Sequence, residues 1–378
     1  MTEPLSSPPI EPSIATVSRT SQCAGERGFS LLKFLLLLVV LFLIAAGAGA
    51  MWTRSEVNRP VAHPSAERII TIEPGAGAAA VVAKLSEAGI VRHPIPLRVY
   101  LRLTGRGSSL RAGDYKFASP ISPMQAIEKI RRGEIFLERV TIPEGYNRFD
   151  IAETLATKTG IATKEEFLRL MSDPSLIEKI APNARNLEGY LFPDTYNYNA
   201  KTTPEELIRA MVNRFNDVFT PEWGTRANQL NLTINQVVTL ASIIEKEAKV
   251  ADERPHMASV FFNRMKIGMA LGSDPTFIYA AILADDYDSN PNQPRHRQRQ
   301  SPYNTYLVTG LPPGPIASPG RASIEAVLYP DNTEDLYFVV NSRDGRHKFS
   351  RTAAEHDAAV SEYRKLQKEM RDEQNANR

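Results

Sequence analysis

The sequence contains a single cysteine, Cys23, among its 378 residues. It can therefore form no intrachain disulfide, and no zinc site built on several thiolates is possible. None of the six histidines falls in an HExxH motif or in another short metal-ligand spacing. We therefore expect no metal site.

An excess of charge of one sign is also lacking. The 45 Lys and Arg residues nearly balance the 43 Asp and Glu residues, which leaves a formal charge of +2. Binding to a nucleic-acid backbone needs a basic excess, so a nucleic-acid partner is not expected. The 42% apolar and 23% charged residues are ordinary for a folded protein and exclude both a wholly disordered chain and a polytopic transporter. The length suggests two to three domains, or one large domain with accessories.

The N-terminal region divides into a polar tail and an apolar run. Residues 1–33 are rich in Pro, Ser and Thr and are predicted to be a disordered cytoplasmic tail. The run 34–52 has 19 residues without a charge, which at about 1.5 Å per residue just spans a bilayer core of roughly 30 Å. We expect an uncleaved transmembrane helix at 34–53. The alternative is a signal peptide cleaved near residues 48–50 (AGA), but the leader and the run are both long for one.

The remaining chain has a mixed α and β pattern, so we predict an α+β fold. Residues 54–67 are interpreted as a linker and 68–140 as a small β–α–α–β module. Its predicted elements are a strand at 68–72, a helix at 78–88, a strand at 113–117, a helix from Ser122 to Gly133 and a strand at 140–142. The strand–glycine–helix pattern of 71–85 recurs at 141–155, which indicates either a duplication or the reuse of a common unit.

Residues 141–365 are predicted to form a mixed α/β catalytic domain. Helix start signals occur at Thr163, Thr203, Thr233 and Thr352, each with Glu or Gln three residues later. A buried strand is expected at 337–340, and a charged, fraying tail at 366–378.

The helix predicted from residue 234 to 250 carries the most informative side chain. Glu245 lies on one helical face with Val238, Ala241 and Ala248, by spacings of seven, four and three. Burial of a carboxylate among apolar residues favours the protonated form that a general acid needs. The alternative is that Glu245 belongs to a charged surface run. Glu247 is about 200° further round and is expected to face solvent, paired with Lys249 or Arg254.

No second carboxylate follows at close spacing. A glycosidase that hydrolyses its substrate usually places two carboxylates across the scissile bond, whereas one acid suffices when the substrate supplies the nucleophile. Asp274 could be a second carboxylate or only a turn residue before Pro275. The Pro-, Gly-, Tyr- and Asn-rich stretches 188–196 and 302–320 suit contacts with sugars or, alternatively, rigid surface turns. The basic stretch 295–299 is interpreted as a solvated loop that could also touch an acidic substrate.

Ordered segments along the chain resemble the endolytic murein transglycosylase (YceG-like) family. The matching segments are 187–196 (LEGYLFPDTY), 241–247 (ASIIEKE), 258–264 (ASVFFNR), 273–276 (SDPT), 303–306 (YNTY), 310–316 (GLPPGPI), 345–349 (GRHKF) and 355–356 (EH). They cover most of residues 68–365. Ala248 departs from the family, where Thr is frequent, and the stretch 284–300 matches no family motif.

The resemblance implies an enzyme anchored in the bacterial cytoplasmic membrane, with the N-terminus in the cytoplasm and the catalytic domain outside. It implies that residues 68–140 form a LysM-like module and that Glu245 is catalytic. The implied reaction cleaves the MurNAc–GlcNAc bond inside nascent peptidoglycan strands and leaves 1,6-anhydro-MurNAc ends, without a cofactor. Peptidoglycan synthases are the implied protein partners.

On this reading, further residues would line or shape the sugar cleft: Asn263, Asp274, Tyr303, Asn304, Tyr306, Pro313 and Gly314. Two other classes of protein remain open. The chain could bind the cell wall without catalysis, or it could be a scaffold for cell-wall synthesis.

Overall fold

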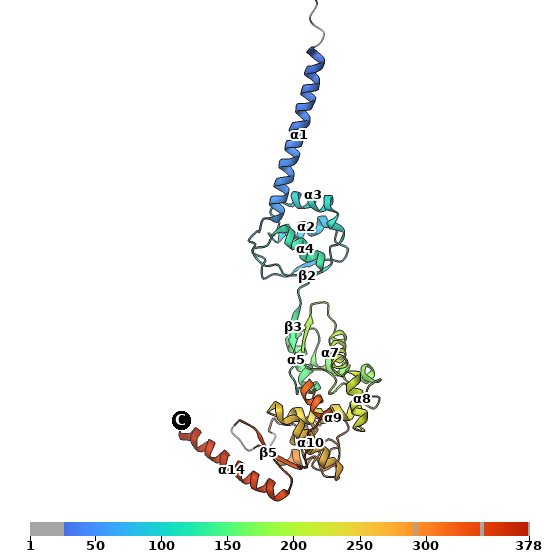
Figure 1. The fold of residues 1–378 in the computed structure, drawn as a ribbon, viewed down its shortest axis with the longest axis vertical. Coiled ribbons are helices and arrows are strands. Elements are labelled where there is room, and N and C mark those ends of the chain that lie inside the picture. Colours follow the sequence, from blue (N-terminus) through green and yellow to red (C-terminus); the bar gives the residue numbers. More distant parts are fainter. Residues whose placement is uncertain (1–25, 291–292, 341–343, 377–378) are drawn as a thin grey trace, which may run out of the picture. The chain divides into compact units, whose positions relative to one another are not determined.

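The computed structural model describes residues 26–290, 293–340 and 344–376, and it divides into two compact units at Phe136/Leu137 (Figure 1). Helices and strands occur in both units, so the mixed class predicted from the sequence is confirmed. Residues 1–25 of the predicted disordered tail lie outside the described part of the chain. Residues 26–33, which were assigned to the same tail, are helical.

The first unit begins with the long helix α1 (Glu26–Asn58). Its part from Leu31 to Asn58 is long and apolar enough to cross a membrane. The predicted linker at 54–67 is wrong at its start, because α1 continues to Asn58. Val57 is only 1% exposed and packs in the core of the unit, and Val61 pairs with Ile121 in a short β-bridge. The end of α1 is therefore part of the folded unit.

The rest of the first unit has a β–α–α–β order followed by a third helix. Strand β1 (Ile70–Ile72) pairs antiparallel with β2 (Gly113–Tyr115), and α2 (Ala78–Glu87) and α3 (Pro94–Thr104) lie between them in sequence. Helix α4 (Pro123–Arg132) follows, with Ser122 forming the predicted capping box. Helix α3 was not predicted. It is the second helix between β1 and β2, whereas α4 follows β2 at the position predicted for it.

The strand expected at 140–142 belongs to the second unit. It is β3 (Glu138–Thr141), which pairs antiparallel with β4 (Thr195–Tyr198). The boundary between the units therefore comes earlier than residue 140. Both predicted strand–glycine–helix units are present: Gly75 and Gly145 have φ of 78° and 75°, and each lies between a strand and a helix, α2 or α5 (Arg148–Thr159).

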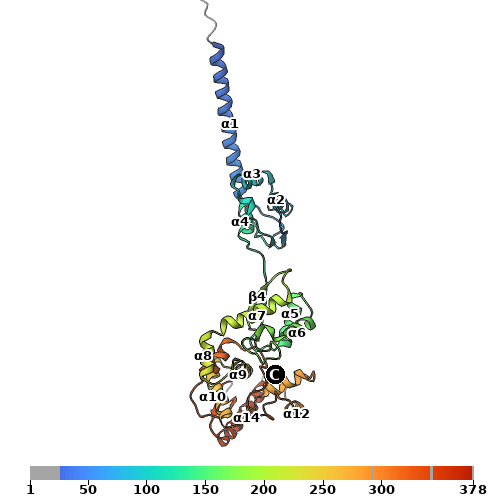
Figure 2. The ribbon, with the colours of Figure 1, turned by 90° about the vertical axis from the view of Figure 1, so that its right-hand side faces the viewer.

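Helices dominate the second unit (Figure 2). The side chains of Thr163, Thr203 and Thr233 cap α6 (Lys164–Met171), α7 (Pro204–Val218) and α9 (Ile234–Glu247) as predicted. Thr352 Oγ1 accepts a hydrogen bond from the Glu355 amide at the start of α14 (Ala353–Ala376). The other helices of this unit are α8 (Pro221–Gln229), α10 (Arg254–Lys266), α11 (Asp274–Leu283), α12 (Pro294–Arg297) and α13 (Arg321–Leu328). Short 3-10 turns occupy Pro174–Ile177 and Ala251–Glu253 here, and Arg106–Ser108 in the first unit.

Helix α9 is the centre of this unit's core. Val237, Val238, Leu240 and Ile243 are fully buried in it, and α13, α10, α11 and α8 all contact it. A hairpin of β5 (Tyr337–Val340) and β6 (His347–Ser350) packs against α10 and α14. Strand β5 is half-buried rather than buried. Helix α14 continues through the predicted charged tail from residue 366 as far as Ala376.

Candidate functional site

Glu245 lies in the last turn of α9. The residues that share its face, Val238, Ala241 and Ala248, are buried as the spacing predicted. The helix ends at Glu247 rather than at 250, because Ala248 is extended, with φ of −74° and ψ of 108°. The Glu245 side chain is only 7% exposed. The sequence reading of Glu245 as a largely enclosed carboxylate therefore agrees with the structure.

Three donor groups surround the Glu245 carboxylate. The Gly320 amide and the Ser323 hydroxyl donate to Oε2 at 3.0 and 2.7 Å, and Nη2 of Arg254 lies 3.5 Å from Oε1. Ser323 in turn accepts a hydrogen bond from Arg254 Nε at 3.0 Å. Hydrogen bonds to a charged group are stronger than neutral ones, so this arrangement fixes the carboxylate in one orientation. Both hydrogen bonds go to Oε2, whereas Oε1 has the ion pair with Arg254.

The loop that supplies Gly320 is held on α9 by a buried bond. The Ile316 amide donates to Ser242 Oγ at 3.0 Å. Gly189 packs against both α9 and this loop. Its φ is 84°, and a Cβ there would come within 2.9 Å of Val238 and closer still to Pro315. Only glycine allows this approach. The tertiary structure thus brings together three segments noted in the sequence: 187–196, 241–247 and 302–320.

A second carboxylate, Glu144, lies beside this site and was not found by sequence reasoning. A Cβ on Gly320 would overlap the Glu144 carboxylate, so Glu144 packs directly against the residue that donates to Glu245. Partial burial raises the pKa of Glu144, the charge of Glu245 raises it further, and the Arg254 guanidinium lowers it. Glu144 as a whole residue is exposed. Two carboxyl groups therefore meet at Gly320, one enclosed and one accessible.

The turn that carries Glu144 is bonded to both neighbouring segments. The Gly145 amide donates to the Ser318 carbonyl at 2.9 Å, and the Ser318 amide donates to the Tyr146 carbonyl at 2.8 Å. Lys246 Nζ donates to the Gly145 carbonyl at 3.1 Å. These bonds set the position of Glu144 relative to α9.

The prediction that Glu247 faces solvent is wrong. Its Oε1 accepts a hydrogen bond from Ser273 Oγ at 2.6 Å, and Arg254 pairs with Glu245 instead. Burial raises the pKa of Glu247 to about 7; the Ser273 hydrogen bond opposes the shift and the Asp274 charge adds to it. The start of α11 covers this side of α9, and helical spacing alone could not show that.

Asp274 and Tyr306 form a pair. Asp274 is the first residue of α11, and it accepts a hydrogen bond from the Tyr306 hydroxyl at 2.5 Å. Burial and the Asp274 carboxylate raise the pKa of Tyr306. The Arg297 guanidinium lies 4.1 Å from the centre of the Tyr306 ring. The Ser273–Glu247 bond connects this pair to the last turn of α9.

The two asparagines expected near sugar have structural partners instead. Asn304 is fully buried and donates to the Arg297 and Arg299 carbonyls at 2.8 and 2.9 Å. Asn263 donates to the Thr333 and Asp335 carbonyls, each at 3.0 Å. Both amides support backbone segments, so the expectation that they line a sugar site is not supported.

The remaining residues predicted to bind sugar differ in exposure. Pro313 is exposed, whereas Gly314 is buried. The Tyr303 hydroxyl lies 3.5 Å from where a Cβ on Gly314 would be, and the Tyr303 ring packs edge-on against Tyr279 at 5.2 Å.

The stretch 295–299 is not simply a solvated loop. His296 is fully buried, and its Nε2 lies 3.0 Å from Asp288 Oδ1. Arg295 Nη2 bonds the other oxygen of the same carboxylate at 2.8 Å, and Arg299 pairs with Asp286. The segment therefore packs on the acidic residues that precede it.

Glu188 is a further buried carboxylate of the LEGYLFPDTY segment. It accepts hydrogen bonds from the Arg148 amide at 3.1 Å and from the Tyr279 hydroxyl at 2.8 Å. Burial raises the pKa of Glu188 to about 7, against these hydrogen bonds. Glu188 is only 3% exposed, and its bonds to Arg148 of α5 and Tyr279 of α11 join these two helices in the core.

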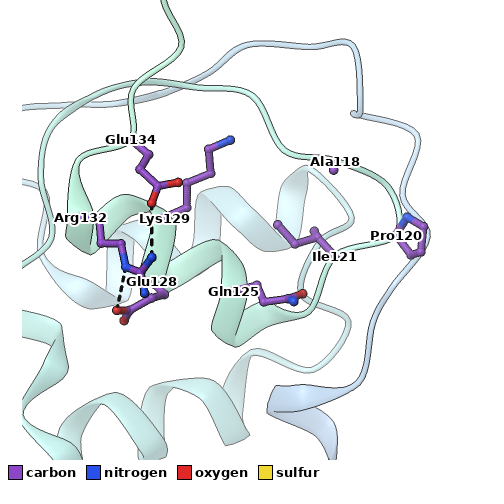
Figure 3. Close-up of a pocket in the computed structure, with 8 residues that line it drawn as sticks. All are labelled: Ala118, Pro120, Ile121, Gln125, Glu128, Lys129, Arg132 and Glu134. Carbon is purple, nitrogen blue, oxygen red and sulfur yellow. Dashed lines mark hydrogen bonds and ion pairs between the residues drawn. The ribbon is translucent and has the colours of Figure 1, made fainter.

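The first unit contains a separate polar pocket of about 390 Å³ on α4 (Figure 3). Glu128, Lys129, Arg132 and Glu134 supply charges at its wall, and Arg132 pairs with both carboxylates. Such a lining suits a polar ligand. Its other lining residues are Ala118, Pro120, Ile121 and Gln125.

Comparison with known proteins decides the family. The profile of the YceG-like family matches residues 70–362. The chain belongs to the YceG-like family. One relative, named endolytic murein transglycosylase, from Bacillus subtilis, is 32% identical over 83% of this chain and 90% of its own length. A protein of the same name from Streptococcus pneumoniae is 30% identical over 86% of this chain and 64% of its own length.

A solved structure supports the YceG-like fold. The crystal structure of a yceG-like protein from Listeria monocytogenes superposes with a TM-score of 0.53 at 30% sequence identity. It covers 77% of this chain and 98% of the Listeria chain.

Proposed function

We propose that this YceG-like protein is an endolytic murein transglycosylase, a lyase that cleaves peptidoglycan strands from within. The names of its relatives support the activity. The observation in this chain that carries the proposal is the enclosed Glu245 carboxylate, oriented by Gly320 and Ser323 and flanked by Arg254. General acid–base catalysis needs such a group in one orientation within reach of the bond.

In the proposed reaction, protonated Glu245 donates its proton from Oε1 to the glycosidic oxygen between MurNAc and GlcNAc. The bond from that oxygen to C1 of MurNAc breaks, and its electron pair stays with the leaving GlcNAc oxygen. The 6-hydroxyl of MurNAc attacks C1, and ionised Glu245 takes the hydroxyl proton. The product is a 1,6-anhydro-MurNAc end; no water is consumed and Glu245 returns protonated.

Glu144 is proposed to assist from the exposed side of the same site. Positive charge develops on the sugar during bond cleavage, and a carboxylate beside Gly320 would stabilise it through space. The Gly320 and Ser323 donors stabilise the ionised Glu245 that forms in the same step. Asp274, Tyr306 and Pro313 are proposed to contact the glycan. Tyr303, Asn304 and Gly314 belong to the segments that carry Tyr306 and Pro313, whereas Asn263 supports residues 333–335.

The first unit is proposed to be the LysM-like module and to hold glycan in the pocket on α4. Its carboxylates and cations could hydrogen-bond the hydroxyl and amide groups of sugars. Helix α1 is proposed to anchor the protein in the cytoplasmic membrane, with the N-terminus in the cytoplasm and the catalytic unit on the wall side. Cleavage of nascent strands there would end their elongation beside the peptidoglycan synthases.

Mass spectrometry of uncrosslinked glycan strands incubated with the full chain tests the proposal. We expect new anhydro-MurNAc ends with the wild type and a loss of about 10²- to 10⁴-fold with Glu245→Gln. The matched control is Glu325→Gln, the same change at an exposed residue of α13. Reducing ends would indicate hydrolysis instead. A folded wild type that retains glycan without cleaving it would indicate a wall-binding or scaffold protein.

A further inference from the structure

Helix α3 exposes an apolar face to its surroundings. Ile95, Val99 and Leu103 recur every four residues and are 69%, 44% and 81% exposed. On the opposite side, Leu97 and Leu101 are buried in the core of the first unit. A helix that is apolar on both sides needs a second apolar environment, because three large neighbouring side chains would otherwise stay in water.

This face lies beside the apolar part of α1. A groove of about 710 Å³ lies between the two helices, with Ala46, Gly49 and Ala50 on one wall and Val99 and Leu103 on the other. In Figures 1 and 2, α3 lies on the side of the unit from which α1 leaves. The two elements belong to the same unit and contact each other. The position of α3 is therefore given relative to the membrane-spanning run.

The depth of α3 follows from helix geometry. The apolar run ends at Trp52, and Ala46 and Ala50 precede that end by six and two residues. At 1.5 Å per residue, these positions lie about 9 and about 3 Å inside the end of the run. Amphipathic helices that lie in a membrane interface bury their apolar face about 5–10 Å deep. Val99 and Leu103 are thus at the depth of the boundary between headgroups and acyl chains.

The charges around this face fit the same surroundings. Arg98 and Arg102 are exposed and each directly precedes a residue of the apolar face. Arg54 lines the groove at the end of α1, where a headgroup layer would begin. The Trp52 ring lies 6.3 Å from His93, the N-cap of α3. Tryptophan and arginine are both favoured at the membrane interface, and arginine attracts anionic lipids.

We propose that α3 lies in the membrane interface, with Ile95, Val99 and Leu103 among the acyl chains of the leaflet in which α1 ends. Its arginines contact anionic headgroups. The inference rests on the proposed crossing of the bilayer by α1. Two attachment points, one spanning and one lying in the interface, fix the orientation of the first unit on the membrane surface. The first unit, together with α1, then cannot rotate freely about the long axis of α1.

The scarcity of cysteine allows a direct test. In a Cys23→Ser background, single Leu38→Cys, Leu103→Cys and Glu134→Cys variants of the full chain are labelled with an environment-sensitive fluorophore. They are then reconstituted in vesicles of phosphatidylglycerol and phosphatidylethanolamine that carry a quencher on the acyl chains. Leu38 reports on the α1 crossing. Glu134 is an exposed control that lies outside the α1–α3 groove.

We expect quenching at position 103 to be several-fold stronger than at position 134 and close to that at position 38. Strong quenching at 38 with none at 103 above the control would overturn the inference and leave the anchor intact. No quenching at 38 would remove the anchor and the inference together. Protection at 103 that increases with protein density, without lipid quenching, would show that a second copy covers the face and would also overturn it.

Discussion

Ser323 offers the sharpest test of how the site works, because its hydroxyl connects two charged side chains. It donates to Glu245 Oε2 at 2.7 Å and accepts from Arg254 Nε at 3.0 Å. A hydrogen bond to a charged group contributes about 1.5–3 kcal/mol. If Ser323→Ala loses that amount only in the transition state, the catalytic rate falls about 10- to 150-fold, at about 1.4 kcal/mol per factor of ten.

The assay is the rate at which anhydro-MurNAc ends form, with kcat and KM measured separately. We expect the loss in kcat rather than in KM, because Ser323 is fully buried and acts through Glu245. The same change also leaves Arg254 without one acceptor, which costs about 1–3 kcal/mol of unfolding free energy. Thermal unfolding has to be measured beside the rate to separate the two effects.

Ser259→Ala is the matched control. Ser259 is also buried in the second unit, and its hydroxyl lies 2.8 Å from the hydroxyl of Thr333 rather than near Glu245. We expect a similar loss of stability with nearly unchanged kcat. The reasoning would be refuted if Ser323→Ala stayed within twofold of the wild type, or if Ser259→Ala lost as much activity.

Three further predictions concern the carboxylates. Glu144→Gln should lower kcat about tenfold, the equivalent of about 1.4 kcal/mol, because it removes the charge proposed to stabilise the developing positive charge of the sugar. Gly320→Ala should lower kcat to a similar extent, since the new methyl group displaces the Glu144 carboxylate. The φ of −75° at Gly320 suits alanine, so the free energy of unfolding should change by about 1 kcal/mol or less. Glu188→Gln should change how the free energy of unfolding depends on pH. Because the pKa of Glu188 is raised, the folded state keeps its proton between about pH 4.5 and 7, where the unfolded state has released it. The stability of the wild type therefore falls by about 3 kcal/mol as pH rises through this window. That fall should be smaller in the Gln variant.

Each of these has its own measurement. The activities of Glu144→Gln and Gly320→Ala are compared with that of the double variant. Losses that multiply would contradict the idea that the methyl group acts by moving Glu144. For Glu188, denaturant unfolding at several pH values in the wild type and in the Gln variant gives the slope. Equal slopes between pH 4.5 and 7 would show that Glu188 does not titrate in this window.

Local sequence signals predicted local structure well. The uncharged run at 34–52 was predicted to be a membrane-spanning helix, and it lies within α1. This could be predicted because length and apolarity alone decide whether a segment can cross a bilayer. Ser122 and Thr233 were predicted as helix caps, and each forms its capping box, since that bond needs only residues three apart. Glu245 was found by helical spacing, because one buried face of α9 determines the direction of its side chain.

Errors arose wherever a second segment was decisive. Glu247 was placed in solvent, but the start of α11 covers it through Ser273. Asn304 was expected to contact sugar, but it is buried beneath its own loop. Residues 54–58 were assigned to a linker, although Val57 packs in the core of the first unit. Periodicity gives the direction of a side chain, but it does not say what lies there.

The sequence by itself therefore determined the long apolar run within α1, several helix caps, the family and the enclosed position of Glu245. Only the tertiary structure decided which groups act on that residue. Gly320 and Ser323 reach Glu245 from 75 and 78 residues away in the chain. The turn with Glu144 is joined to α9 by a bond between residues 101 apart, from Lys246 to Gly145. Hydrogen bonds and charges act over a few ångströms in space, whereas sequence spacing constrains only neighbours within one element.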